Sequence, residues 1–212
     1  MTNSIEDIGN AGCIMSIGSN TTAAHPIIAM KVKHAVQRGA KLIVVNPREI
    51  KLVRHANLWL RLKPGTDVAL IMGLIRLILE EGLQDQKFID EKCENFEALK
   101  ESLKEFSLEK VAAITELPAE QIIAAAKMYA SCGPSAILYT LGITEHTHGT
   151  DSVMALANLA MVTGNVGKPG SGVNPLRGQN NVQGACDMGA LPNLFPGYQS
   201  VTNPNIRAKF EK

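Results

Sequence analysis

Strand-like and helix-like segments alternate over the first two thirds of the chain, and this alternation constrains the fold more than any other feature. Four short apolar runs predict strands at Cys13–Gly18, Lys41–Val45, Leu58–Leu62 and Ser135–Thr140. Helical patterns predict helices at His25–Arg38, 50–55, Asp67–Glu81 (capped by Thr66) and Asp151–Thr163, with a mainly helical stretch from Asp85 to Ser131. Parallel strands require crossover connections, so this order predicts an α/β fold, a Rossmann-like parallel sheet with helices on both faces.

The composition is that of a globular protein. Of the 212 residues 45% are hydrophobic, which argues against a disordered chain. Lys and Arg number 21 against 20 Asp and Glu, a net charge of +1 that argues against a dedicated nucleic-acid binder. No apolar run reaches the roughly 20 residues of a membrane-spanning helix, and the first residues lack the features of a secretory signal. We therefore expect a cytoplasmic protein without membrane insertion.

The cysteines and histidines give no metal site. Cys13, Cys93, Cys132 and Cys186 lie far apart and form no C-x-x-C pair, so no zinc, iron–sulfur or disulfide framework is predicted. Two histidines, at 146 and 148, are close in sequence, but no cluster of cysteines or carboxylates accompanies them. We predict no metal ligand in this chain.

The amino-acid composition changes after Gly164. From there to Gly197 glycine, asparagine, glutamine and proline replace the apolar runs. A long segment of this kind is unusual inside a compact domain, and it is either functional or a solvated linker. We expect an α/β domain over residues 1–177 and an irregular Gly/Asn-rich segment over residues 178–212.

The loops that follow the predicted strands suggest a nucleotide site. Parallel strands end at one edge of a sheet, and ligands bind there. Small polar loops at the start of helices favour the binding of phosphate. The cationic side chain of Arg48 could add a contact to phosphate, and the carboxylate of Asp67 could accept two N–H bonds from a guanine-type edge. The candidate residues are Gly18, Ser19, Asn20, Asn46, Arg48, Pro64, Gly65, Asp67, Gly142 and Thr144. Alternatively these are ordinary turn residues, with Asp67 charging a helix start and Arg48 in a surface ion pair.

Standard nucleotide signatures are missing. No G-x-G-x-x-G follows the first strand, and Asn46 stands where a ribose-binding acid is usual. The segment Gly167–Lys168–Pro169 does not complete a P-loop. The run from Gly172 to Gly189 offers many polar donors and close backbone approach but no nucleophile–base pair. This composition suits the binding of a large polar cofactor and an anionic substrate.

The segment Gly164–Gly189, with its Arg177–Gly178–Gln179–Asn180–Asn181 core, closely resembles the catalytic (alpha) subunit of molybdenum- or tungsten-dependent formate dehydrogenases. These are molybdopterin oxidoreductases related to dimethyl sulfoxide reductase. The resemblance implies a domain that holds one molybdopterin guanine dinucleotide, with the guanosine and phosphates on the four-loop edge. By the same resemblance Gly178, Gln179 and Asn180 reach toward the pterin, and Arg177 orients the formate carboxylate beside the metal.

The resemblance also implies groups that this sequence does not supply. The family's [4Fe–4S] cysteines and its metal-ligating selenocysteine or cysteine correspond to earlier parts of its chain, so neither cluster nor metal is bound here. The implied partners are formate, the remainder of the catalytic subunit and electron-transfer subunits, and the chain alone should not oxidise formate. Two alternatives stay open: a flavin- or NAD-binding Rossmann-type domain, and a non-catalytic binding module.

Overall fold

The computed structural model describes residues 1–211, and the chain divides into two compact units, Met1–Leu176 and Arg177–Lys212. The division lies one residue before the boundary expected from the sequence. Each unit is described by itself.

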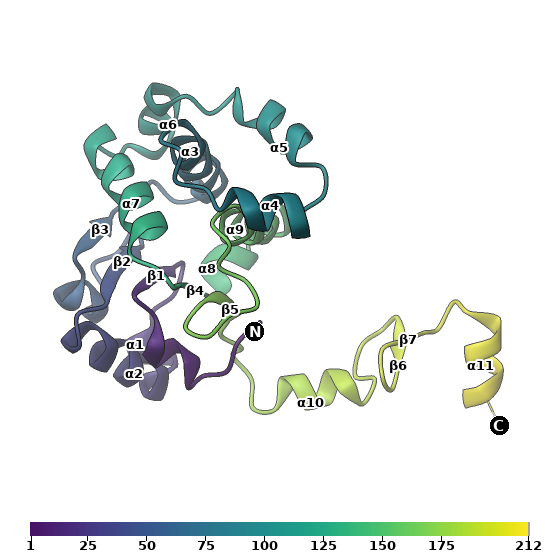
Figure 1. The fold of residues 1–212 in the computed structure, drawn as a ribbon. Coiled ribbons are helices and arrows are strands. Elements are labelled where there is room, and N and C mark those ends of the chain that lie inside the picture. The colour runs from purple at the N-terminus through teal and green to yellow at the C-terminus, as the bar shows by residue number, and fades with distance from the viewer. Residues whose placement is uncertain (212) are drawn as a thin grey trace. The chain divides into compact units, whose positions relative to one another are not determined.

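The first unit contains a five-stranded sheet in the order β3-β2-β1-β4-β5 (Figure 1). Every pairing in it is parallel. The strands are β1 Cys13–Ile17, β2 Lys41–Val45, β3 Leu58–Leu60, β4 Ser135–Tyr139 and β5 Gly172–Pro175. The predicted parallel sheet is therefore confirmed, and four of its strands lie where the apolar runs placed them.

Helices cover both faces of this sheet, as predicted. Figure 1 shows α3, α7 and α9 on one side of the sheet and α1 and α2 on the other. The helices of the first unit are η1 Asp7–Asn10, α1 Thr21–Ala24, α2 Pro26–Gln37, η2 Lys51–His55, α3 Asp67–Glu80, α4 Gln86–Lys92, α5 Phe96–Leu103, α6 Leu108–Thr115, α7 Ala119–Ser131, α8 Leu141–Thr144 and α9 Gly149–Val162.

Alternate residues of each strand enter two separate cores. In β1, Met15 packs in the larger core with α3, α7 and α9, while its neighbour Ile14 packs in the smaller core with α2. This alternation follows from the period of two in a strand. Both faces are apolar, and for this reason the strands read as continuous hydrophobic runs in the sequence.

The strand β5 was not predicted. Its sequence, Gly172–Val173–Asn174–Pro175, has little strand propensity, but parallel pairing with β4 stabilises it. It lies at the edge of the sheet, where a proline is tolerated. Thr2 covers the free edge: its N–H donates to Val173 O over 3.1 Å, and its Oγ1 accepts from Val173 N–H over 2.9 Å.

The second unit carries more regular structure than its composition indicated. It contains α10 Val182–Asp187, the antiparallel pair β6 Leu194–Phe195 and β7 Gln199–Ser200, and α11 Pro204–Phe210. Among the described residues of this unit, Cys186 alone is buried. Over residues 1–211, none of the helices has the length and apolar character required to cross a bilayer.

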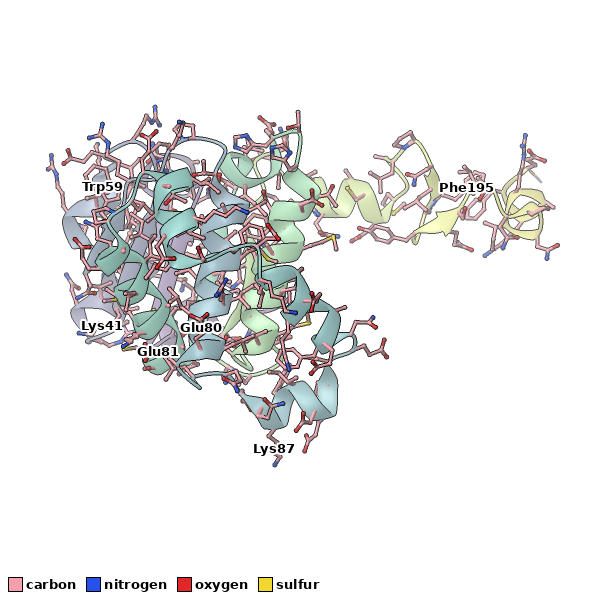
Figure 2. The ribbon with its side chains drawn as sticks, turned by 90° about the horizontal axis from the view of Figure 1, so that it is seen from above. Lys41, Trp59, Glu80, Glu81, Lys87 and Phe195 are labelled. Atoms are coloured by element: carbon pink, nitrogen blue, oxygen red, sulfur yellow. The ribbon has the colours of Figure 1, made fainter. Side chains whose placement is uncertain are left out.

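Helix α3 runs antiparallel to the strands. In Figure 2, Lys41 at the start of β2 lies at the same end of the first unit as Glu80 and Glu81, where α3 finishes, and Trp59 lies at the other end. Helix α3 therefore begins at the edge of the sheet where the strands have their carboxyl ends. The predicted cap by Thr66 is wrong in detail, because its hydroxyl donates to Lys63 O over 2.7 Å and makes no cap bond.

Candidate functional site

The loops after β1, β2, β3 and β4 converge on one cavity of about 330 Å³. The sequence placed ligand-binding residues on all four loops because parallel strands end at a common edge. Of the predicted residues, those that line this cavity are Gly18, Asn20, Asn46, Arg48, Pro64, Gly65, Asp67 and Gly142. The four-loop edge is thus a single concave surface within the first unit.

The cavity lies at the point where the strand order reverses. From β1 the chain continues to β2 on one side, while β4 pairs with β1 on the other side. Crevices at such a point are the usual ligand sites of open α/β sheets. The crevice is closed at its base by Gly18 and Gly142, whose N–H donates to Gly18 O over 3.1 Å.

Only glycine fits at this crossing. A Cβ on Gly142 would lie 2.6 Å from Gly18 O, and Gly18 has a φ of +56°, in the left-handed region that favours glycine. Thr140 adds a second bond to the same oxygen, from its Oγ1 over 2.8 Å. The two loops are therefore packed together firmly, and their spacing fixes the base of the cavity.

The loop after β2 is held by Asn46. Its side-chain Oδ1 accepts the Arg48 N–H over 2.9 Å, and its carbonyl accepts the Trp59 indole N–H over 2.9 Å. The amide oxygen of Asn46 is thus engaged in the turn, which leaves the Nδ2 group as the donor that it can offer to a ligand. Arg48 is exposed on the cavity wall and contributes a permanent positive charge.

Asp67 is the acidic residue of the cavity. It begins α3 and is only 7% exposed. Burial raises the pKa of its carboxyl above the ordinary value, against smaller opposing effects from its own backbone N–H and from His146. A buried carboxylate that faces a cavity is stabilised by donors from a ligand. Paired N–H groups, as on the edge of guanine, would meet this need.

Two predicted residues do not line the cavity. Ser19 is 1% exposed, and its Oγ lies 2.9 Å from Oγ1 of Thr21, so its hydroxyl stabilises the loop from inside. Thr144 is exposed on α8 but is not among the residues of the cavity wall. Neither placement tests whether these residues contact a ligand.

The second unit holds the remaining candidates. Arg177, Gly178, Gln179 and Asn180 are all exposed residues of that unit. Their roles toward a pterin and a substrate stay predictions.

Sequence reasoning missed three residues of the cavity wall, Pro47, Leu62 and His146. Pro47 lies in the loop after the second predicted strand, which the sequence had already assigned to this edge. Leu62 was predicted to end the third strand, which finishes at Leu60 instead. His146 follows α8, and its Nε2 lies 3.0 Å from Gly142 O. Its position after the fourth predicted strand is the signal in the sequence that indicates a place at this edge.

A second groove of about 320 Å³ adjoins the cavity and shares Asn20 and Arg48 with it. Its wall includes Lys51 and Glu49. A larger cavity of about 440 Å³ lies elsewhere, between α4, α5 and α9, and is mainly apolar. The strand-end cavity is the better candidate site because it combines charge, backbone turns and the reversal of strand order.

The described residues hold no group of three or more histidines, cysteines or acids that could bind a metal ion. Burial raises the pKa of the Cys13 thiol to about 12, with a smaller contribution from Cys132, so this thiol is not a nucleophile near neutral pH. Cys13 is not among the residues that line the strand-end cavity, whose titratable side chains include Asp67 and His146.

The sequence matches the family Molybdopterin oxidoreductase over residues 1–211. It is 53% identical over 201 residues to the F420-dependent formate dehydrogenase subunit alpha of Methanocaldococcus jannaschii, covering 95% of this chain and 30% of that protein. It is 45% identical to formate dehydrogenase H of Escherichia coli over 212 residues, 100% of this chain and 30% of the relative.

A solved structure supports the fold. Acetylene hydratase from Pelobacter acetylenicus is similar to this chain, with a TM-score of 0.70 and 32% sequence identity. The similarity covers 76% of this chain and 24% of the hydratase chain. The chain spans about a third or less of the length of these relatives. The match over residues 1–211 and the strand-end cavity agree, and the chain belongs to the molybdopterin oxidoreductase family.

Proposed function

We propose that the first unit binds the guanosine end of a molybdopterin guanine dinucleotide, as part of a formate dehydrogenase catalytic subunit. The observation that carries this proposal is the convergence of four strand-end loops on one cavity that contains the buried Asp67. Membership of the family implies a molybdopterin cofactor and its metal. The guanine form of the cofactor, and molybdenum or tungsten as the metal, belong to the proposal.

The residues present fit the nucleotide part of this cofactor. Asp67 would accept the two N–H groups of the guanine edge, as a bidentate charge-assisted pair. Arg48, on the same cavity wall, would neutralise phosphate, with the Asn46 amide as a further donor. Gly18, Gly65 and Gly142 let the ligand approach the backbone closely.

Formate oxidation is proposed for the longer protein. The bound metal centre would accept the two electrons released when formate becomes carbon dioxide. From this chain, Arg177 would bind the formate carboxylate through its planar, permanently charged guanidinium and so orient the substrate. Gly178, Gln179 and Asn180 would hold the pterin by side-chain and backbone donors.

Other parts of the proposal concern partners and location. The remainder of the catalytic subunit would supply the metal ligand and the [4Fe–4S] cluster, and separate subunits would receive the electrons. The two relatives named as formate dehydrogenases, one of them described as a subunit alpha, support this assignment. We propose a cytoplasmic location on the sequence features alone.

Calorimetric titration of the full chain tests the nucleotide site. GMP should bind saturably, and AMP, which lacks the paired N–H groups on its edge, should bind much more weakly. The variant Asp67→Asn should lose about 10- to 100-fold in affinity for GMP, because charge-assisted bonds are lost. Asp151→Asn, an exposed acid at the start of α9, is the matched control. Absence of GMP binding to the folded chain would refute the proposal.

A further inference from the structure

His146 contributes a planar aromatic ring to the lining of the strand-end cavity. Among the described residues that line it, His146 alone has an aromatic ring. The ring is exposed in the turn between α8 and α9, so a ligand can reach it.

The ring is held in place by the base of the cavity. Its Nε2 lies 3.0 Å from the carbonyl oxygen of Gly142, which can only accept a hydrogen bond, so Nε2 carries the proton. Gly142 in turn packs against Gly18. The imidazole is thus attached to a glycine that packs closely against the neighbouring loop, which limits the entropy that the ring would lose on stacking against a ligand.

The ring also lies near the carboxylate that would read the base. His146 contributes an electrostatic effect on Asp67, and both side chains line the one cavity. A planar group and a carboxylate that line the same cavity are the two elements of purine recognition, one for the face of the base and one for its edge.

We propose that His146 stacks on the face of the purine whose edge Asp67 binds. This inference rests on the proposed nucleotide site and goes beyond it, because it assigns affinity and selectivity to different residues. Stacking does not distinguish one purine edge from another. His146 therefore raises the affinity for purine nucleotides generally, while Asp67 selects guanine.

Three substitutions separate stacking from support of the loop. His146→Phe keeps an aromatic face and loses the bond to Gly142 O. His146→Gln keeps a side-chain donor for that bond and loses the ring. His146→Ala loses both. His148→Ala, an exposed neighbour outside the cavity wall, is the matched control.

The measurement is calorimetric titration of the full chain with GMP and with IMP, which lacks the second N–H donor group of the guanine edge. His146→Ala and His146→Gln should weaken GMP binding about 5- to 100-fold, the range of base–aromatic stacking. His146→Phe keeps the ring but not the bond that positions it, and should bind GMP more tightly than either of these variants. The ratio of GMP to IMP affinity should stay at the wild-type value in every variant whose binding is measurable.

The outcomes distinguish this inference from the proposed function. If the wild type binds no GMP, both the proposed function and the stacking role of His146 are refuted. If the wild type binds GMP and His146→Gln retains that affinity while His146→Phe loses it, His146 is only a support for the loop, and stacking is refuted. Equal binding by all the variants would likewise overturn the role of His146 and leave the nucleotide site intact.

Discussion

At the scale of single residues, the binding role that we propose for Asp67 is accompanied by a penalty for folding at neutral pH. Burial raises the pKa of its carboxyl above the ordinary 3.8, so the folded chain binds this proton more strongly than the unfolded chain does. The contribution of Asp67 to the free energy of unfolding is therefore largest when it is protonated, and falls as the pH rises from the ordinary toward the raised pKa. The proposed binding of a ligand to this carboxylate would account for its position.

This argument predicts how Asp67→Asn changes thermal stability. The variant should melt with the wild type at acid pH, where Asp67 is protonated, and should melt at a higher temperature at neutral pH. Thermal melts of both chains from about pH 3, below the ordinary pKa of 3.8, to about pH 7 measure the difference. The exposed Asp151→Asn control should show no such trend. A lower melting temperature for Asp67→Asn at neutral pH would instead show that Asp67 serves α3 as a helix-start charge.

Gly142 both lines the strand-end cavity and packs closely against Gly18. A methyl group in Gly142→Ala would lie 2.6 Å from Gly18 O, so the loops after β1 and β4 would have to separate. We expect a loss of about 1–3 kcal/mol in the free energy of unfolding, as for other overpacked sites, together with weaker GMP binding. Urea denaturation measures the first effect.

Gly9→Ala is the control for that experiment, because its added methyl would lie 3.6 Å from Arg38 Nη2, an ordinary contact. If Gly142→Ala proved as stable as Gly9→Ala and bound GMP normally, the close approach of the two loops would not shape the cavity.

At the scale of elements, the sequence predicts those parts whose own residues determine their structure. Four of the five strands (β1 to β4) and α3 were predicted because their apolar residues form clear runs or repeats. The strand β5 was missed because pairing with β4, rather than its Gly-Val-Asn-Pro sequence, makes it a strand. The eight cavity residues followed from the topology of parallel sheets. His146 did not, because its place on the wall depends on the turn between α8 and α9.

The connection from α9 to β5 gives a prediction at this scale. Asn165 is 3% exposed, its Oδ1 accepts the Ser135 N–H over 2.9 Å, and its Nδ2 donates to Thr163 Oγ1 over 2.8 Å. It thereby joins the end of α9 to the start of β4. Asn165→Ala should lower the free energy of unfolding by about 1–3 kcal/mol, because buried partners lose their bonds.

Chemical denaturation measures this loss against Asn10→Ala, a substitution at an exposed position. The sequence placed Asn165 at the start of a segment interpreted as functional. Equal stability of the two variants would show that the connection through Asn165 has no structural role.

At the scale of the whole molecule, the two units differ in how much they bury. The first unit contains both hydrophobic cores and the complete strand-end cavity. Within the described part of the second unit, Cys186 is the sole buried residue. We therefore predict that nucleotide binding resides in the first unit and does not require the predicted pterin and substrate residues from Arg177 onward.

Amide hydrogen exchange of the full chain, with and without GMP, tests the central claim most directly because it locates the bound nucleotide. The account predicts protection in all four strand-end loops, at residues 18–22, 46–48, 63–67 and 141–146, and unchanged exchange around the apolar cavity at residues 93–102. Protection confined to the apolar cavity or to the second unit, or no protection at saturating GMP, would contradict it.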